Sequence, residues 1–562
     1  MLRVFGLALC LTSLTLGVSG FTPRRANGAD LDLNGNWKLT LLGPLVESDF
    51  LVLSLKGESG NLKGEVKNLA QPIPEPPKLT QASFVDGLLS VTMKVGTVEG
   101  TFAGKAAGND RFLGMLKVGP ENVPARLQKT KAEVLDPPPQ QPPQLVRTYF
   151  QARGERDPKK RVKVLQGLLA QTPGSPTLGV VYADVIRGAT AAGLSDGEVR
   201  TVVKEWLEGA QLFGKEQRKQ VLIQASLALQ GQKAFSNLAL EIAKEADAVL
   251  GKDDAVQTRA DVVKALVEAA QLNGEETLAA KGNEKAAKLE AELDADYHAK
   301  VPPFKPEGRL ERKRESKRVV LMELFTGAQC PPCVAADVAF DAMSTTYETT
   351  ELATLQYHLH IPGADPLTNA DSVARAGYYP RFNGTPSVFL DGQALPPGGG
   401  PMSFSEEKYK EYRSVIDRVL QRPAGAKIDL KVTREGQVLK IRAYAESSTK
   451  ASTKQTLRLA ITEEQIRYTG SNGLRFHQHV VRTFPGGVGG KALSGGKAET
   501  ELVVRLNDLR KGLESYLSTY ERDEGGFPKK LPGIDLAGLS VVAFVQDDDT
   551  KGVLNAAVEE VK

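Results

Sequence analysis

The sequence predicts a multidomain α+β protein with an N-terminal small β-barrel or meander, an α-helical bundle or solenoid, an α/β domain and a C-terminal β-sandwich. Three observations support this fold class. The chain has 562 residues, which is too long for a single ordinary hydrophobic core. The spacing of apolar residues changes along the chain from alternation to helical periodicity and back again. Proline-rich segments occur where the pattern changes.

The composition excludes several classes of protein. A hydrophobic content of 41% and a charged content of 25% are ordinary for globular domains. The net charge of +4 is small for this length, so we expect neither a nucleic-acid partner nor binding to an anionic membrane surface.

Residues 1–29 are predicted to be a signal peptide. Arg3 precedes an apolar run from Val4 to Val18, and small residues follow, which is typical of a secretory leader. The run is short for a membrane-spanning helix, and no later segment is long and apolar enough to cross a membrane. We therefore expect an exported protein, periplasmic or extracellular, without a stable membrane span after cleavage.

Residues 30–133 are predicted to form the small β-barrel or meander. Short β-like runs are separated by Gly, Asn and Asp, as the turns of an antiparallel sheet require. No polar residues converge on an identifiable ligand site, which favours a spacer or interaction domain. The expected strands are Trp37–Leu41, Phe50–Leu55, Leu62–Val66, Leu88–Val95, Val98–Phe102, Phe112–Leu116 and Pro124–Leu127.

Residues 134–144 form a predicted proline-rich linker, because such a run favours an extended polyproline helix. Residues 145–305 then show helical periodicity with Gly and Pro breaks. This pattern predicts about eight helices in a bundle or repeat-like solenoid, without a clean repeat period. Ser195 and Glu198 match a helix capping box, and Trp206 on the following apolar stripe is expected in the core.

Residues 425–562 return to alternating apolar and polar residues, which predicts a β-sandwich of immunoglobulin-like size. A helix from Leu506 to Tyr520 is expected as an insertion in this domain. The expected strands are Lys427–Val432, Val438–Ala445, Thr456–Thr462, Glu499–Val504 and Leu539–Val545.

Residues 306–424 carry the tetrapeptide Cys330–Cys333, in which two prolines separate the cysteines. The run Arg318–Phe325 predicts a buried strand before it, and helical spacing predicts a helix after it, from Val334. Cys330 then lies at a helix start, where unpaired N–H groups and the positive dipole end favour a thiolate. A thiolate is the form that attacks disulfides, and the second sulfur, one turn along, can reach back to close a disulfide.

This stretch resembles the thioredoxin superfamily. The order strand, Cys-x-x-Cys, helix is followed by a predicted strand at Ala353–His360, a helical stretch near Ala370–Gly377 and a late strand after Thr385 and Pro386. The resemblance implies a cis-proline beside the cysteines: the Thr385 backbone would pair with a substrate chain, and Pro386 would shield the sulfurs. Glu323 resembles the family's buried carboxylate, which helps proton transfer.

The cysteine count agrees with redox chemistry. The chain has three cysteines, and Cys10 lies in the predicted signal peptide, so the mature chain keeps only Cys330 and Cys333. The expected activity is that of an exported thiol–disulfide oxidoreductase that exchanges with protein thiols and disulfides and with a redox partner protein. The Cys330–Cys333 disulfide would itself be the redox group, so no further cofactor is expected.

Two alternatives stay open. In the first, the thioredoxin-like fold is a rigid module of a non-catalytic extracytoplasmic binding or scaffold protein. In the second, the chain handles copper or zinc, because four of its five histidines form two pairs, His358 with His360 and His477 with His479. Residues two apart on a strand face the same side and can offer two nitrogens to one metal. The pairs lie in different predicted domains, which favours packing over a metal site.

Overall fold

The computed structural model describes residues 31–562 except 59–61, 71–74, 120, 138–140, 310–316, 381, 449–453, 530 and 532. The chain divides into two compact units, Met1–Leu293 and Asp294–Lys562. The predicted multidomain α+β class is confirmed. Within the described ranges, no helix combines the length and apolar character that a membrane-crossing segment needs. The predicted signal peptide, residues 1–29, lies outside the described residues.

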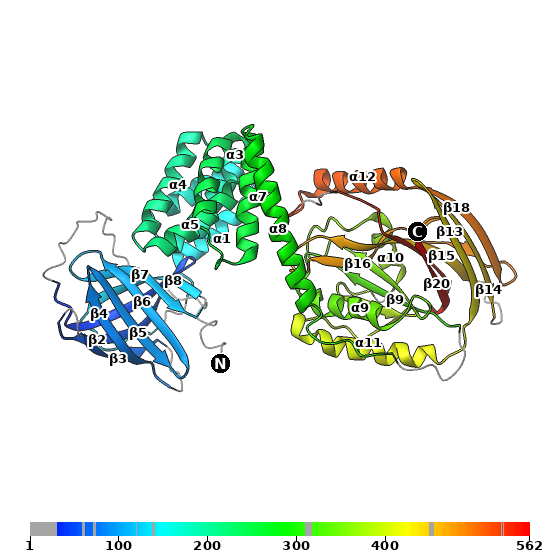
Figure 1. The fold of residues 1–562 in the computed structure, drawn as a ribbon, viewed down its shortest axis with the longest axis horizontal. Helices are drawn as coiled ribbons and strands as arrows, with labels where there is room; N and C mark the ends of the chain where they lie inside the picture. The colour runs from blue at the N-terminus through cyan, green and yellow to red at the C-terminus, as the bar shows by residue number, and fades with distance from the viewer. Residues whose placement is uncertain are drawn as a thin grey trace. The chain divides into compact units, whose positions relative to one another are not determined.

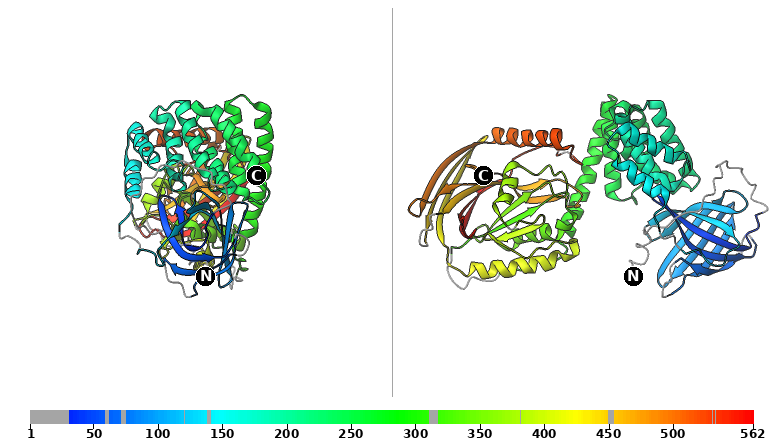
Figure 2. Two further views of the ribbon diagram at one scale, coloured as in Figure 1. Left: turned by 90° about the vertical axis from the view of Figure 1, so that its left-hand side faces the viewer. Right: turned by 180° about the vertical axis from the view of Figure 1, so that it is seen from behind.

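The first unit begins with a near-barrel of eight antiparallel strands in the order β3-β2-β1-β8-β7-β6-β5-β4 (Figures 1 and 2). Its two edge strands meet at the antiparallel bridge between Leu62 and Ala82. The strands are β1 (Gly35–Gly43), β2 (Val46–Lys56), β3 (Lys63–Leu69), β4 (Lys78–Val85), β5 (Leu88–Val95), β6 (Val98–Ala106), β7 (Arg111–Val118) and β8 (Glu121–Thr130).

Side chains fill the interior of this near-barrel. The Phe112 ring lies 5.4 Å from the Trp37 ring and 5.9 Å from the Phe84 ring, measured between centroids. The strand that contributes Phe84, β4, was not expected from the sequence, because its apolar residues alternate only over its last half. A filled interior is the usual state of a small barrel and agrees with a spacer or interaction domain.

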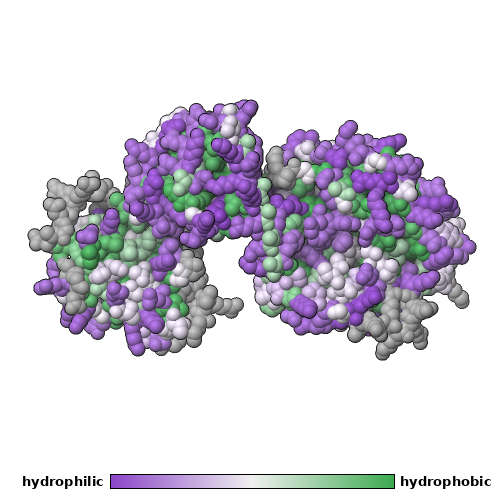
Figure 3. Space-filling model, viewed as in Figure 1, coloured by the Kyte–Doolittle hydropathy of each residue, from purple (hydrophilic) through white to green (hydrophobic). Residues whose placement is uncertain are grey.

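The helices of the first unit pack as successive hairpins, α2 with α3, α4 with α5 and α6 with α7, and α5 also packs on α3 and α7. The predicted capping box joins Ser195 and Glu198, and Trp206 stacks on Tyr182 in the core. Side chains on the face of these helices drawn in Figure 3 are mostly hydrophilic. The helices are α1 (Gln144–Gly154), α2 (Pro158–Leu169), α3 (Gly179–Ala192), α4 (Asp196–Gln211), α5 (Lys215–Leu229), α6 (Ser236–Val249), α7 (Val256–Leu272) and α8 (Glu276–Lys300), whose last residues, from Asp294, belong to the second unit.

The second unit is built on a nine-stranded mixed sheet with the order β12-β11-β9-β10-β16-β15-β19-β20, in which β17 pairs with β15 (Figure 1). β10 runs parallel to β9, and β11 runs antiparallel to it. The strands are β9 (Val320–Thr326), β10 (Leu352–His358), β11 (Ser387–Leu390), β12 (Gln393–Ala394), β15 (Gln455–Arg467), β16 (Phe476–Thr483), β17 (Lys491–Ala492), β19 (Leu539–Asp547) and β20 (Val553–Val561).

Helices cover both faces of this sheet around the cysteine motif. Alternate residues of β9, Val320, Met322 and Leu324, pack against α9 (Val334–Thr346) and α11 (Ser405–Leu420). Their neighbours Leu321 and Phe325 face the other side, where α10 (Ala370–Tyr378) packs. Residue 323 therefore points to the face opposite α9, as the two-residue period of a strand requires.

The nine-stranded sheet contains strands from both sides of residue 425, where the C-terminal domain was predicted to begin. β10, before this residue, pairs with β16, after it. A separate three-stranded sheet, β13-β14-β18, packs on β15 and β19 to form the C-terminal sandwich, and α12 contributes Leu506 and Leu513 to the same core. The remaining elements are β13 (Ala426–Glu435), β14 (Val438–Ser447), β18 (Lys497–Arg505) and α12 (Leu506–Glu524).

Candidate functional site

The cysteine motif lies at the end of β9 and the start of α9. Cys330 opens a 3-10 turn, η4 (Pro331–Cys333), which continues directly into the α-helix at Val334. The backbone N–H of Cys333 donates to the carbonyl of Cys330 at 3.0 Å. The two cysteines form a disulfide with an S–S distance of 2.02 Å and Cα atoms 5.4 Å apart. The predicted β–α unit around a Cys-x-x-Cys disulfide is therefore present.

The segment before β11 lies against this disulfide. The peptide bond between Thr385 and Pro386 is cis. The Thr385 hydroxyl lies 3.6 Å from the Cys330 sulfur, and the Thr385 carbonyl oxygen lies 4.0 Å from it. Gly399 lies between the motif and Pro386, since a Cβ at Gly399 would be 2.1 Å from the Pro332 oxygen and 2.9 Å from the Pro386 Cγ. The fold thus brings four of the five predicted site residues together.

Access to the sulfurs is restricted. Cys330 is 1% exposed and Cys333 is fully buried, although the two prolines between them are exposed. The Gly400 N–H donates to the Pro332 carbonyl at 2.6 Å, and the turn between β15 and β16 packs on Ala328, whose carbonyl accepts from Asn472 at 3.0 Å. In this conformation, the surrounding loops leave almost none of the Cys330 side chain accessible from outside the protein.

Glu323, the fifth predicted site residue, lies on the other face of β9. Its carboxylate forms a bidentate ion pair with Arg375 of α10, with Nε–Oε1 and Nη2–Oε2 distances of 2.8 and 2.9 Å, and both side chains are fully buried. The hydroxyls of Tyr357 and Tyr379 also donate to it. With α9 on the opposite face, this geometry fits a structural role for Glu323 better than a part in proton transfer with the cysteines.

A different carboxylate, which was not predicted from the sequence, follows the disulfide on α9. Asp337 follows Cys333 by four residues on α9, so the two side chains lie on the same helix face one turn apart. Asp337 is 1% exposed and accepts from the Thr326 hydroxyl at 3.0 Å and from the Gln356 amide at 3.3 Å. Burial raises the pKa of Asp337 to about 7, even though the Thr326 hydrogen bond lowers it. The four-residue spacing after Cys333 was the only sequence signal that could have indicated it.

Polar groups continue from Asp337 to the loop before Cys330. Gln356 also contacts His358 Nε2 at 3.2 Å, and His358 Nδ1 lies 2.8 Å from the buried carboxylate of Asp365. That carboxylate accepts the backbone N–H of Ala328, two residues before Cys330, at 2.6 Å. Burial raises the pKa of Asp365, but His358 and two backbone N–H groups outweigh it and hold the pKa below its usual value.

The two predicted histidine pairs meet through one member of each, His358 and His477. The His358 ring meets the His477 ring edge-on at 4.8 Å between centroids, while His360 stacks on Tyr520 of α12 at 3.8 Å. Burial lowers the pKa of His477 to about 3 and that of His479 to about 4. In the described part of the chain, no group of three or more His, Cys, Asp or Glu side chains is placed to hold a metal ion.

Replacing Asp337 by Asn is expected to change the pH dependence of stability. Asp337 has a raised pKa in the folded state, so it favours folding only while protonated: its contribution is complete below the usual pKa of 3.8 and is lost as pH rises to about 7. Asp337→Asn removes this loss, which amounts to up to about 4 kcal/mol. Urea unfolding between pH 4 and 8 should show the variant gaining stability over the wild type up to about pH 7. A constant difference across this range would contradict the buried, proton-binding Asp337.

No family model matches the chain, and no curated protein matches it. Among solved structures, the chain is similar to HBP35 of Porphyromonas gingivalis, with 17% identity over 44% of this chain and 77% of that one, at a TM-score of 0.28. It is also similar to the alkylpurine DNA glycosylase AlkC of Pseudomonas fluorescens bound to DNA containing an abasic site analog, with 10% identity over 72% of this chain and 81% of that one, at a TM-score of 0.15. Both TM-scores are below 0.5, so neither likeness supports a conclusion about fold or function.

Proposed function

We propose that the chain is an exported thiol–disulfide oxidoreductase that acts on protein disulfides and dithiols through Cys330 and Cys333. The observation that carries this proposal is the disulfide at the start of α9, with the Thr385 hydroxyl, next to the cis peptide bond, 3.6 Å from the Cys330 sulfur. The resemblance of this stretch to the thioredoxin superfamily supports the same chemistry. The exported location rests on the leader at residues 1–29 and belongs to the proposal.

In the reducing direction, the Cys330 thiolate attacks one sulfur of a substrate disulfide, and the other substrate sulfur leaves as a thiolate. The Cys333 thiol then gives its proton to the Asp337 carboxylate, and the Cys333 sulfur attacks the Cys330 sulfur of the mixed disulfide. The Cys330–Cys333 bond forms, and the second substrate sulfur leaves as a thiolate. Two electrons pass from the dithiol of the protein to the substrate; the reverse sequence oxidises a substrate dithiol. A partner protein would restore the starting state.

The near-complete burial of the disulfide favours one other candidate, the non-catalytic binding or scaffold protein. A structural disulfide resists glutathione, whereas a catalytic one exchanges with it. The two functions therefore differ in how the folded chain responds to thiols.

Equilibration of the purified full chain with glutathione redox buffers tests the proposal. We expect a reversible two-electron couple at Cys330 and Cys333, measured by alkylation and mass spectrometry, together with catalysed reduction of insulin disulfides. A disulfide that stays oxidised in reduced glutathione until the protein is denatured, with no insulin reduction, would favour the scaffold protein instead.

A further inference from the structure

Three titratable side chains follow one another at four-residue intervals: Cys333, which caps the start of helix α9, and Asp337 and Asp341 within the helix. Residues four apart on an α-helix are separated by about 6 Å along its axis and rotated by about 40°. The three side chains therefore follow one side of the helix, each rotated slightly from the one before it. Cys333 and Asp337 are buried, whereas Asp341 is partly exposed. The series runs from the sulfur towards the protein surface.

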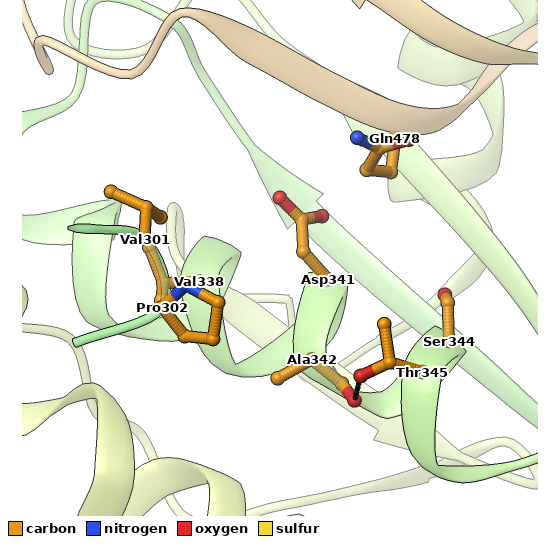
Figure 4. A pocket seen from close by; sticks show the side chains of 8 residues that line it. All are labelled: Val301, Pro302, Val338, Asp341, Ala342, Ser344, Thr345 and Gln478. Atoms are coloured by element: carbon orange, nitrogen blue, oxygen red, sulfur yellow. Dashed lines mark hydrogen bonds between the residues drawn. The ribbon is translucent and has the colours of Figure 1, made fainter. Parts of the chain in front are cut away.

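Asp341 lines a cavity of about 240 Å³ in the second unit (Figure 4). In Figure 4 its carboxylate points into the space between Val301 and Gln478. Two other lining residues, Ser344 and Thr345, are exposed, so the cavity reaches the surface. A single water needs roughly 10–15 Å³ of such volume, so this cavity has room for several.

The Asp341 carboxyl is suited to exchange protons at this place. Its Oδ1 atom is buried and has no hydrogen-bond partner among the described residues. Burial, and secondarily the Asp337 charge, raises the pKa of Asp341 well above its usual value. A carboxyl oxygen without a hydrogen-bond partner binds and releases a proton without breaking a strong ion pair.

Other titratable groups face the two carboxyls from the surrounding elements. Tyr297 of α8 interacts electrostatically with Asp341 and Asp337, and Tyr412 of α11 interacts electrostatically with Asp337. His358 at the end of β10 and Asp365 in the following loop act on Asp337 in opposite directions. Burial and neighbouring negative charges, among them Glu411 for Tyr412, raise the pKa of both tyrosines, so they stay protonated at neutral pH.

We propose that Asp341 and its cavity form the route by which the proton taken from Cys333 leaves the protein and, in the reverse direction, returns. This inference rests on the proposed function. Asp337 accepts the Cys333 proton, Asp341 releases its own proton to water in the cavity, and the proton on Asp337 then passes to Asp341, directly or through one water. One proton enters the series and one leaves it, and no electrons move along it. Asp341 acts through Asp337 and is a positioning residue, not a catalytic one.

Single-turnover kinetics of the full chain test this route. Reduced protein is mixed with a peptide disulfide, quenched with acid and analysed by mass spectrometry, so that formation and decay of the mixed disulfide at Cys330 are measured separately. Asp341→Asn should slow the decay about tenfold and flatten its pH profile, because a relay proton is lost. It should leave the formation rate unchanged. Ser344→Ala, at another residue of the same cavity, should leave both rates unchanged.

Chemical rescue separates proton transfer from a structural effect. Formate is small enough to enter the cavity of an Asp341→Ala variant and should restore its decay rate in proportion to formate concentration, with no effect on Ser344→Ala. Should the asparagine variant not fold, Asp341→Ala with and without formate decides the question. A wild-type decay rate in Asp341→Asn at every pH, or an Asp341→Ala variant that is insensitive to formate, would overturn the proposed route. If the wild type forms no mixed disulfide at all, the proposed function has failed instead.

Discussion

Cys330→Ser is expected to abolish disulfide exchange, lowering kcat/KM for a protein disulfide by at least about a thousandfold, because serine supplies no thiolate to attack sulfur. Cys333→Ser is expected to behave differently. The attacking Cys330 remains, but the sulfur that resolves the mixed disulfide is missing. This variant should accumulate a covalent complex with its substrate, visible on non-reducing gels and lost on reduction.

Each serine variant serves as the stability control for the other. Both lose the same disulfide, which closes a loop of only four residues and contributes about 2 kcal/mol. A difference between them in exchange activity is therefore due to chemistry and not to folding. Exchange at the wild-type rate in Cys330→Ser, or a Cys333→Ser variant that forms no mixed disulfide, would contradict the assigned order of attack.

Local sequence patterns were sufficient to predict the elements around the disulfide. The apolar run before the motif is the strand β9, and the helical spacing after it is α9. Ser195 and Trp206 were likewise predictable, since a capping box and an apolar stripe depend on residues a few positions apart. Such features are encoded where they occur, and no distant part of the chain is needed to interpret them.

Pairing between distant strands could not be predicted in the same way. β16 begins more than a hundred residues after β10 ends, yet the two strands are neighbours in the nine-stranded sheet. Periodicity indicates which face of a strand is buried but not which strand lies beside it. β16 and β20 were not expected at all, because their polar residues interrupt the alternation; Arg482 in β16, for example, is buried against Glu463.

For a related reason, sequence position alone could not show that Glu323 and Asp337 lie on different sides of β9. Glu323 stands in the strand before the motif, where the family resemblance places an acid, and its partner Arg375 lies 52 residues further along the chain. Asp337 lies on the helix that carries Cys333 and is buried against Thr326 and Gln356. Only the three-dimensional arrangement distinguishes an acid held by an arginine from one held by neutral groups, and burial among such groups raises the pKa of Asp337 to about 7.

Arg375→Met is expected to destabilise the second unit by about 3–5 kcal/mol, because it leaves the Glu323 carboxylate buried without its cation. The guanidinium also contacts Gln546 at 2.9 Å and lies over the Tyr378 ring at 4.5 Å, so its removal loses these contacts as well. Burial raises the pKa of Tyr379 well above its usual value, so its hydroxyl stays a donor and cannot balance the charge. Both tryptophans, Trp37 and Trp206, belong to the first unit. Unfolding is therefore best followed by amide hydrogen exchange in β9 and β10.

A second substitution separates the ion pair from the redox site. In the double variant Glu323→Gln/Arg375→Met neither charge remains, so it should be more stable than Arg375→Met alone. If Glu323 has only a structural role, folded Glu323→Gln/Arg375→Met should exchange disulfides within about threefold of the wild-type rate and with the wild-type pH profile, because Asp337 is untouched. If the folded double variant loses exchange activity and its mixed disulfide decays slowly, Glu323 and not Asp337 would be the carboxylate that takes part in proton transfer. Equal stability of the single and double variants would show that the buried charge is relieved in some other way.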